Sequence, residues 1–178
     1  MNIFYTKKGD KGKSYIKNNF VSKDHIVLEA LGELDELNSL IGVVKNYVKN
    51  YKKKLQEVQE NLFIIQAQLV WFLYPKFKKT KLSKEKMKKL EKEISEIEKK
   101  IKPEKKFIIP GKEVKSAWLH YLRAVCRRTE RKLVSLSKKY KIEKETLIYI
   151  NRLSSYFYAL ARLIVYKKGL KEDYPSYK

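Results

Sequence analysis

The sequence predicts an all-α protein, a single-domain antiparallel bundle of five helices. Its 178 residues include only six glycines and four prolines, so the long segments between them contain few residues that favour turns. Within these segments apolar residues recur at the spacing of one helix face. With 43% hydrophobic residues the chain can bury one sizeable core, and its length favours one domain over two.

The first two helices are expected over about residues 24–51 and 53–74. Asp24 has a side chain suited to capping the first helix, and Pro75 ends the second, because the residue before a proline disfavours helix. The apolar stripe of the first helix consists of Val27, Leu31, Leu34, Leu37, Ile41, Val44 and Val48.

Three further helices follow in the sequence. Ser83 can cap the third helix and Pro103 ends it, and its apolar residues recur about every 3.5 positions while the other faces are charged. The fourth helix is expected over about residues 113–139. The fifth is expected over about residues 144–168, with Gly169 as its C-terminal stop.

The chain shows no internal repeat and no linker long enough to separate domains. We therefore expect one domain over residues 1–178, in which residues 24–168 form the bundle. The flanking segments 1–23 and 169–178 lack helical periodicity and are expected to be irregular.

The formal net charge of +22 arises from 42 Lys and Arg against 20 Asp and Glu. A field of this sign attracts anions, whether nucleic acid, acidic membranes or small polyphosphates, and charge alone does not choose among them. Much of the charge lies in Lys- and Glu-rich helical stretches, a composition that is also expected of a heat-adapted surface.

Cysteine and histidine are scarce. The lone Cys126 excludes an intrachain disulfide and a multi-cysteine metal site, and His25 and His120 are too few for a histidine-rich metal centre. The longest apolar run, NLFIIQAQLVWFLY, falls short of a membrane span, and the N-terminal segment has no apolar signal core. We therefore expect a soluble cytoplasmic protein without a metal site built from protein ligands.

The fourth helix carries a charged stripe beside its apolar one. Arg123, Arg127, Glu130 and Arg131 recur at helical spacing, about 100° round the helix from the core stripe. Arginine forks suit carboxylate and phosphate, and they stand out in a chain whose cations are mostly lysine. The alternative interpretation is a solvated face in which Glu130 pairs with Arg127 or Arg123.

Two other helices also place polar residues near mid-length: Asp35 and Glu36 in the first, and Asn151, Arg152, Ser154 and Ser155 in the fifth. Buried polar groups are costly unless they are paired or bound to something, so three such helices favour a binding site. Cys126, one step towards the core from the charged stripe, is expected to be a buried, inert thiol.

The segment YTKKGDKGKS, residues 5–14, ends like a phosphate-binding P-loop but is too short to be one. The first glycine of a Walker A motif would fall at Lys7. The glycines of this segment could still let backbone amides approach a phosphate group in another scaffold.

Five motifs together resemble the PduO-type ATP:cob(I)alamin adenosyltransferases. They are YTKKGDKG, LEALGELDELNSLIG, FIIPG, RAVCRRTERKLV and INRLSSYFYALAR. They occur in the family's order and spacing and run from the N-terminus to about Arg162, so they cover most of the chain. Each motif is weak alone, and five in register are strong.

The resemblance implies a trimer of five-helix bundles with active sites between subunits. There ATP would adenosylate cob(I)alamin to give adenosylcobalamin and triphosphate, with Mg²⁺ as the cation of the nucleotide. The residues that match family positions around ATP, together with Arg131 on the charged stripe, are Thr6, Lys7, Gly9, Asp10, Gly12, Ser14, Lys23, Glu130, Arg131 and Asn151.

The resemblance also assigns four residues to the reaction. Arg127 matches a position at the nucleotide, and Asp35 and Arg123 match a pair that bridges neighbouring subunits beside the corrinoid. Phe107 matches an aromatic residue that closes the lower face of the corrin and displaces its axial base. A reductase and a cobalamin-dependent enzyme would be possible partners.

Three positions depart from the family pattern. Ser155 stands in place of an acidic residue, Lys112 replaces a glycine after FIIPG, and Lys13 stands where a smaller or uncharged residue is usual. We expect these differences to affect corrinoid binding more than ATP binding.

The alternative function is a basic helical nucleic-acid-binding protein without enzymatic activity, for which the charge of +22 is the argument. Against it, the arginines lie beside carboxylates and no helix shows a recognition module. A third interpretation is a structural bundle or a corrinoid carrier without turnover, and the polar groups on three helices argue against pure structure. The sequence therefore favours the adenosyltransferase.

Overall fold

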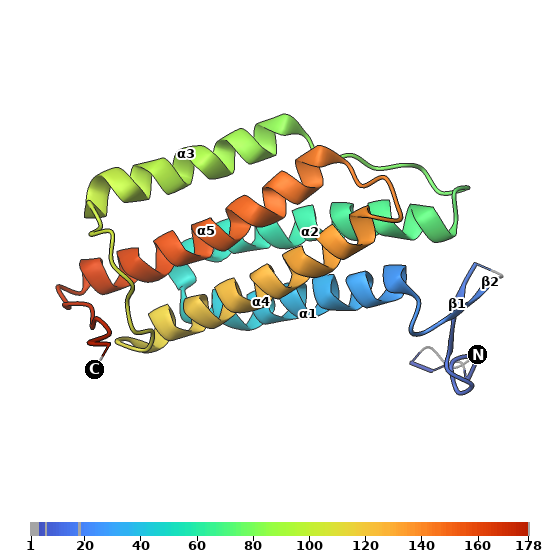
Figure 1. Cartoon of the computed structure of the whole chain (residues 1–178), viewed down its shortest axis with the longest axis horizontal. Coiled ribbons are helices and arrows are strands. Elements are labelled where there is room, and N and C mark those ends of the chain that lie inside the picture. Colours follow the sequence, from blue (N-terminus) through green and yellow to red (C-terminus); the bar gives the residue numbers. More distant parts are fainter. Residues whose placement is uncertain (1–3, 6, 18, 178) are drawn as a thin grey trace.

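The computed structural model describes residues 4–5, 7–17 and 19–177, and Figure 1 shows its elements. Within these residues the chain forms five α-helices, one short 3-10 helix and a two-stranded hairpin. They are β1 (Lys13–Ile16), β2 (Asn19–Ser22), α1 (Ile26–Tyr47), η1 (Lys49–Tyr51), α2 (Lys52–Leu73), α3 (Lys84–Ile101), α4 (Val114–Ser137) and α5 (Lys144–Lys167). The five predicted helices are confirmed.

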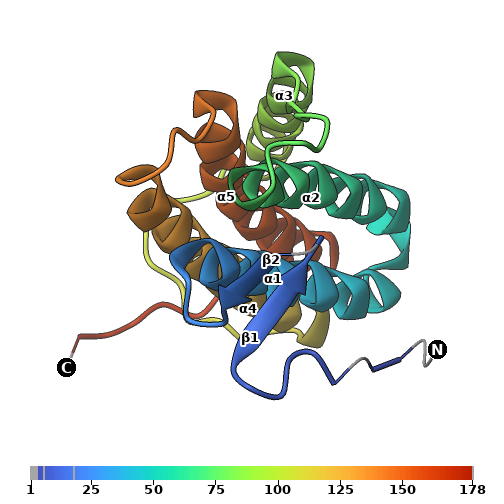
Figure 2. The same cartoon turned by 90° about the vertical axis from the view of Figure 1, so that its right-hand side faces the viewer.

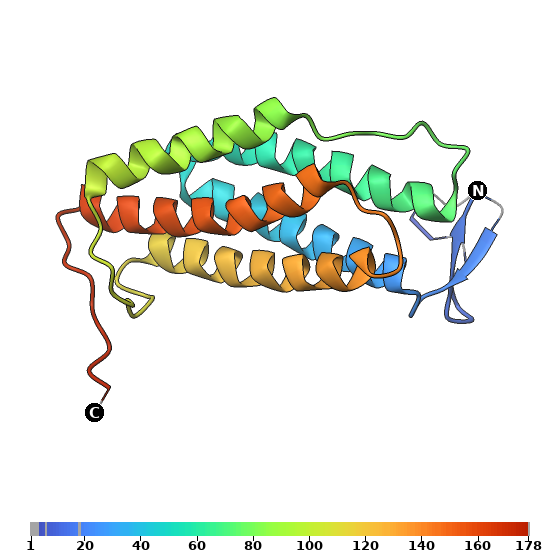
Figure 3. The same ribbon diagram turned by 45° about the horizontal axis from the view of Figure 1, so that its top comes forward.

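Each helix runs opposite to the one before it in the chain, and the helices lie along the long axis of the molecule (Figures 1 and 3). α1 packs on α2 and α4, α4 packs on α5, and α5 packs on α3. Because directions alternate along the chain, α3 and α5 are neighbours that run the same way. The bundle is therefore antiparallel except where α3 meets α5.

The core is one hydrophobic cluster to which every helix contributes. Of the stripe predicted for α1, Leu31 is half-buried, and the buried members are Val27, Leu34, Leu37, Ile41, Val44 and Val48. Removing apolar side chains from water stabilises the fold by about 25 cal/mol per Å², so this stripe determines which face of α1 turns inward.

α3 is the helix with the smallest buried face. Leu90 and Ile97 are its buried residues, as the spacing of its apolar residues predicted. Charged side chains on its other faces link it to its neighbours; for example, Nζ of Lys54 on α2 lies 2.6 Å from a carboxylate oxygen of Glu93. Ion pairs thus supplement a narrow apolar contact.

The first residues of α1 differ from the prediction, because His25 and not Asp24 is its N-cap. Nδ1 of His25 accepts a hydrogen bond from the backbone N–H of Val27 at 3.2 Å, which satisfies a donor that helix geometry leaves unpaired. The expected cap at Asp24 is therefore wrong. α1 also ends at Tyr47, before η1, whereas Gly169, at φ +64°, follows α5 as predicted.

The N-terminal segment is not irregular throughout, which corrects the expectation for residues 1–23 and the all-α class. β1 and β2 pair as an antiparallel hairpin, in which Tyr15 lies opposite Phe20 with ring centroids 5.1 Å apart. Lys17, at φ +41°, lies between the two strands. Aromatic and β-branched residues favour strands, and here they pair locally.

The two ends of the bundle carry different loops. The hairpin lies beyond the first turn of α1, whereas the linker of residues 102–113 and the C-terminal segment lie together at the opposite end (Figures 1 and 2). None of the described helices combines the length and the apolar character needed to cross a membrane.

Candidate active site

A hollow of about 550 Å³ opens on the surface between α4 and α5. The residues that line it are Arg127, Glu130, Arg131, Val134, Ser135 and Asn151. Four of the predicted site residues therefore lie together, three from successive turns of α4 and one from α5. Below, "the hollow" means this group of six residues.

A line of hydrogen bonds fixes the polar groups of the hollow. Nδ2 of Asn151 donates to Oε1 of Glu130 at 2.8 Å, and Oδ1 of Asn151 accepts from Nη1 of Arg152 at 2.8 Å. Nε of Arg152 in turn donates to Oε1 of Glu91 on α3 at 2.9 Å. Glu130 thus pairs with Asn151, and the alternative pairing with Arg127 or Arg123 is wrong.

The arginines of the hollow remain available to a ligand. Arg127 is exposed, and Arg131 donates from Nη1 to the backbone carbonyl of Arg127 at 3.1 Å. The pairing between Asn151 and Glu130 leaves both guanidinium groups without a carboxylate partner among the described residues. Two such forks beside one carboxylate suit a polyphosphate that carries a cation.

The adjacent Arg128 has a different role. Its Nε donates to Glu33 of α1 at 2.8 Å, and its Nη2 donates to Glu36. The hydrogen bonds to Glu33 and Glu36 raise the pKa of Arg128 above its ordinary value. This arginine joins α4 to α1, and helix geometry places it on a different face from the charged stripe.

The glycine loop, residues 7–12, is closed by backbone hydrogen bonds. The N–H of Gly12 donates to the carbonyl of Gly9 at 3.2 Å, and the N–H of Lys23 donates to the carbonyl of Gly12 at 2.9 Å. Gly12 has φ +70°, a conformation that side chains disfavour. Lys7 also lies in the left-handed region, at φ +58°.

Lys23 lies over this loop. A Cβ atom added to Gly9 would be 3.4 Å from Nζ of Lys23, so the ammonium group and the glycine backbone face one small space. Asp10 is exposed in the loop, and Ser14 is half-buried in β1 opposite Val21. The expected role of Thr6 falls on a residue outside the described ranges.

One chain does not bring the loop to the hollow. None of the described loop residues lines the hollow, and the hairpin lies at the end of the bundle where α1 begins (Figure 1). At that end the hydroxyl of Tyr140, which follows α4, lies 3.4 Å from Nε2 of His25, the N-cap of α1. The two predicted phosphate-binding parts are therefore separate within a single chain.

Asp35 and Arg123 are also apart within one chain. Asp35 is exposed on α1 and forms no ion pair with any residue of ranges 4–5, 7–17 and 19–177. The guanidinium carbon of Arg123 lies 5.2 Å from the ring centre of Tyr158 on α5, a cation–π distance. Asp35 and Arg123 therefore do not pair with each other within one chain.

Phe107 lies far from the hollow. It is 79% exposed in the linker before α4, and Arg127 lies ~20 Å along α4 from the first residue, Val114. Lys112, which departs from the family pattern, bonds through Nζ to both carboxylate oxygens of Asp173 at 2.9 and 3.1 Å. The substituted glycine position thus connects the linker to the C-terminal segment.

Cys126 and His120 are not placed to act as reacting groups. Cys126 is fully buried, its Sγ lies 3.5 Å from the carbonyl of Ile150, and burial raises its pKa, so the thiol is inert as predicted. Burial lowers the pKa of His120, and the charge of Arg123 lowers it further. The imidazole packs edge-on to Tyr158.

A divalent cation would need its ligand to bring oxygens with it. Among the described residues, no group of three or more His, Cys, Asp or Glu side chains is placed to hold a metal ion. Glu130 supplies one carboxylate beside two arginines. This fits Mg²⁺, which proteins usually bind through one or two carboxylates together with phosphate oxygens of the substrate.

Two residues that support the hollow were not predicted as site residues. Arg152 was noted only as a polar residue in an apolar helix, and Glu91 was not singled out at all. Arg152 could have been found, because it follows Asn151 directly. Glu91 had no sequence signal, since it is one of many glutamates on the charged faces of α3.

The fold and the site define a helical-bundle protein that combines a basic hollow suited to a polyphosphate with a glycine loop. The chain matches the cobalamin adenosyltransferase family over residues 4–164, and it belongs to this family. Its resemblance to the PduO-type enzymes is thereby confirmed, whereas the nucleic-acid-binding alternative finds no support.

Relatives and solved structures agree. The corrinoid adenosyltransferase of Bacillus subtilis (strain 168) is 34% identical over 172 residues, 93% of this chain and 88% of that protein. The corrinoid adenosyltransferase PduO of Salmonella typhimurium is 36% identical over 162 residues, but the chain spans only 48% of its length. A variant PduO-type ATP:corrinoid adenosyltransferase from Lactobacillus reuteri, complexed with cobalamin and ATP, has a TM-score of 0.90 at 31% identity, covering 97% of this chain and 96% of that one.

Proposed function

We propose that this protein transfers the 5′-deoxyadenosyl group of ATP to the cobalt of cob(I)alamin, giving adenosylcobalamin and triphosphate. The observation that carries the proposal is the hollow, in which Arg127, Glu130 and Asn151 lie together in a chain that belongs to the cobalamin adenosyltransferase family. The glycine loop with Lys23 over it supplies a second group of phosphate-binding atoms.

In this chemistry the protein needs to supply neither a nucleophile nor a base. Cob(I)alamin is itself the nucleophile: its cobalt electron pair attacks the ribose C5′ atom, the C5′–O bond breaks, and that electron pair leaves with the triphosphate. The protein therefore has to align the reactants and stabilise the growing negative charge of the leaving group. We assign this second task to Arg127, with Arg131 beside it.

The loop and the carboxylate complete the nucleotide site in this proposal. The backbone of residues 7–12 and the ammonium groups of Lys7 and Lys23 would hold the triphosphate. Glu130, fixed by Asn151, would hold the divalent cation that ATP brings. When bound, Mg²⁺ neutralises phosphate charge. Thr6, Asp10 and Ser14 stay predictions as nucleotide contacts.

We infer that the active enzyme is a homotrimer with its sites between subunits. Two features support this: the loop and the hollow are apart within a chain, and Asp35 and Arg123 lack each other as partners. Exposed apolar side chains on the same two helices, Val43 and Tyr47 on α1 and Val114 and Tyr121 on α4, also favour a covered surface. The number of subunits comes from the family resemblance.

Phe107 is the residue that we assign to the lower face of the corrin. The exposed ring of Phe107 contributes little to the core of its own chain, so it is free to contact a ligand. Under a corrin it would displace the axial base and ease reduction to Co(I). We propose a reductase as the electron source and a cobalamin-dependent enzyme as the recipient of the product. Cytoplasm is the compartment we propose, in keeping with a single, buried thiol.

The proposal is tested by mixing the purified protein with ATP, Mg²⁺ and chemically reduced cobalamin and following the absorbance change as the Co–C bond forms. Equal amounts of adenosylcobalamin and triphosphate are expected, and omission of ATP is the control. If a protein shown by circular dichroism to be helical produced no adenosylcobalamin, the proposed function would be wrong. Triphosphate without the Co–C product would point to hydrolysis of ATP instead.

A further inference from the structure

The C-terminal segment, residues 170–177, lies against the linker that carries Phe107. The N–H of Ile109 donates to the carbonyl of Asp173 at 2.8 Å, and this single β-bridge pairs the two segments. The ammonium group of Lys112 bonds to the carboxylate of the same Asp173. Figure 1 shows both segments at the same end of the bundle.

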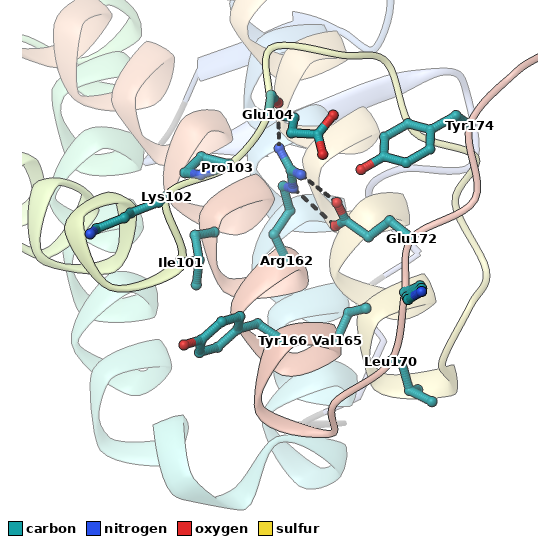
Figure 4. Close-up of a pocket in the computed structure, with 11 residues that line it drawn as sticks. Ile101, Lys102, Pro103, Glu104, Arg162, Val165, Tyr166, Leu170, Glu172 and Tyr174 are labelled. Atoms are coloured by element: carbon teal, nitrogen blue, oxygen red, sulfur yellow. Dashed lines mark hydrogen bonds and ion pairs between the residues drawn. The ribbon is translucent and has the colours of Figure 1, made fainter.

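Arg162 of α5 joins the same two segments from below, as Figure 4 shows. Nε of Arg162 donates to Oε1 of Glu172 at 2.9 Å, and Nη2 donates to the other carboxylate oxygen. Nη1 donates to the backbone carbonyl of Glu104 in the linker at 3.3 Å. One guanidinium group thus holds the tail and the linker.

The ion pair between Arg162 and Glu172 is the buried part of this contact, with side chains only 8% and 12% exposed. Burial alone would lower the pKa of Arg162, but the hydrogen bonds and the charge of Glu172 raise it. A buried charge without its partner is strongly unfavourable, so Glu172 has a definite place. The exposed pair of Lys112 and Asp173 contributes less.

Apolar packing does not hold the linker in place. A cavity of about 640 Å³ opens between the tail, α5 and the linker, and Pro103, Tyr166, Leu170 and Tyr174 are among the residues that line it. The linker residues between Glu104 and Ile109 are exposed or half-buried. Segments with few buried apolar contacts open easily unless polar contacts hold them.

Phe107 lies between Glu104 and Ile109, two of the points at which the linker is held, and the ammonium group of the adjacent Lys106 lies 5.4 Å from the ring centre of Tyr174 in the tail. We propose that Arg162, Glu172 and Asp173 are positioning residues for Phe107, which set where its exposed ring meets the corrin. This inference rests on the proposed function. It also gives Lys112 a role, because a lysine at this position adds a bond to the tail that a glycine cannot make.

The two starting states of the substrate separate positioning from general stability. Cob(II)alamin takes one electron from an added chemical reductant to become cob(I)alamin, and loss of its axial base makes that step easier. Cob(I)alamin supplied already reduced needs no such help. A misplaced Phe107 should therefore slow the reaction from Co(II) and leave the reaction from Co(I) nearly unchanged.

The test compares two truncations of the full-length protein. The long truncation removes residues 171–178 and also carries Arg162→Met, so that no buried charge is left unpaired. The matched control removes only residues 175–178 and keeps Glu172 and Asp173. Thermal unfolding and circular dichroism verify that both proteins are folded, and a Glu172→Gln variant, with the whole tail present, provides a second route to the same result.

We expect the long truncation and Glu172→Gln to lower the rate from Co(II) by roughly ten- to a hundredfold, the size of effect that small misplacements cause. The rate from Co(I) should stay near that of the unaltered protein, and the short truncation should leave both rates unchanged. The EPR spectrum of bound cob(II)alamin should show the nitrogen coupling of a retained axial base in the altered proteins only.

Two outcomes would overturn the inference: equal slowing from Co(II) and Co(I), which means a purely structural tail, or no slowing from either state. An unaltered protein that forms no Co–C bond even from Co(I) would instead contradict the proposed function. The two failures are therefore distinguishable in one experiment.

Discussion

The hollow on α4 and α5 and the glycine loop are two proposed phosphate-binding parts that are built in opposite ways. In the hollow, side chains from three helices are bonded to one another, from Glu91 through Arg152 and Asn151 to Glu130. In the loop, closure comes from backbone hydrogen bonds and from Gly12, whose φ of +70° is a conformation that side chains disfavour. The side chains of the hollow are thus held in place within one chain, whereas one chain fixes only the backbone shape of the loop.

This difference indicates which part needs interactions from outside its own chain. A preformed group of side chains binds its ligand without further ordering, whereas a loop held by a few backbone hydrogen bonds gains order when something binds it. In the proposed assembly that partner is ATP held on a neighbouring subunit. The predictions below test each part in turn, beginning with the largest expected effect.

Removing Arg127, the residue proposed to stabilise the leaving triphosphate, should have the largest effect. Arg127→Ala should lower kcat by about 10²–10³, because one charge-stabilising contact in the transition state is worth about 2.7–4 kcal/mol. Arg127 is exposed, so helicity and the melting temperature should hardly change. Steady-state formation of adenosylcobalamin measures the loss.

A matched control removes the same charge elsewhere. Lys92→Ala deletes an exposed cation of α3 that pairs with Glu96 at 4.0 Å. Its activity should match that of the unaltered protein. Equal losses for Arg127→Ala and Lys92→Ala would mean that the overall positive field, and not the hollow, accounts for activity.

Charge reversal tests whether Asp35 and Arg123 pair across neighbouring subunits. Asp35→Arg or Arg123→Asp alone should lower activity by roughly 30-fold, corresponding to about 2 kcal/mol for a broken interfacial pair. Each single variant should also lower the fraction of trimer measured by sedimentation velocity. The double variant should regain part of the activity and part of the trimer. Recovery should be partial, because Arg123→Asp also removes the contact with Tyr158. Additive losses in the double variant would contradict the proposed pair.

The effect of a substitution at Gly12 on ATP binding should depend on whether the new residue tolerates the backbone conformation there, and not on the size of its side chain. Nothing lies within 4 Å of a Cβ added at Gly12, yet its φ of +70° disfavours most side chains by about 1–2 kcal/mol. Gly12→Val should therefore raise the KM for ATP by roughly 5- to 30-fold with little change in kcat. Gly12→Asn should raise it less, since asparagine tolerates this region. Equal KM values for the two variants would disprove the conformational argument.

The smallest effect concerns the start of α4, on which the hollow depends. Glu113 caps this helix by accepting from the backbone N–H of Ser116 at 2.8 Å, and Lys168 donates to it at 2.7 Å. Burial alone would raise the pKa of Glu113, but the hydrogen bonds from Lys168 and Ser116 lower it below its ordinary value of 4.5. Glu113→Gln should therefore lower the free energy of unfolding by about 1 kcal/mol at pH 7.

The pH dependence follows from the direction of that shift. A lowered pKa in the folded state adds stability above the ordinary value of 4.5, and this stability is lost as the pH falls through the folded pKa. Urea unfolding of the two proteins should therefore give converging stabilities below pH 4.5. A difference that persists undiminished at low pH would show that the carboxylate charge is not the cause.

The helices could be predicted because their apolar stripes repeat over many turns and prolines separate them. The hairpin was missed, although YIKNNF holds aromatic and β-branched residues around two asparagines, because two four-residue strands offer too short a pattern to stand out from a loop. The cap at His25 was missed for another reason. Asp24 is the commoner capping type, and which of two neighbours caps a helix depends on backbone angles.

Within the site, the sequence placed Arg127, Glu130 and Arg131 together, since they share a helix face. The hydrogen bond between Glu130 and Asn151 could not be predicted, because the sequence does not specify the axial position of α5 relative to α4. The separation of Phe107, the loop and the hollow was equally beyond reach from the residues alone. Only the family resemblance had suggested sites between subunits.

The separation of the loop from the hollow has a genetic consequence. In a ring whose sites each take a loop from one subunit and a hollow from the next, a chain with a damaged loop and a chain with a damaged hollow are each inactive alone. Every ring that contains both kinds has at least one junction where an intact loop faces an intact hollow. Two different defective alleles of this gene should therefore complement each other, whereas two copies of the same defect should not.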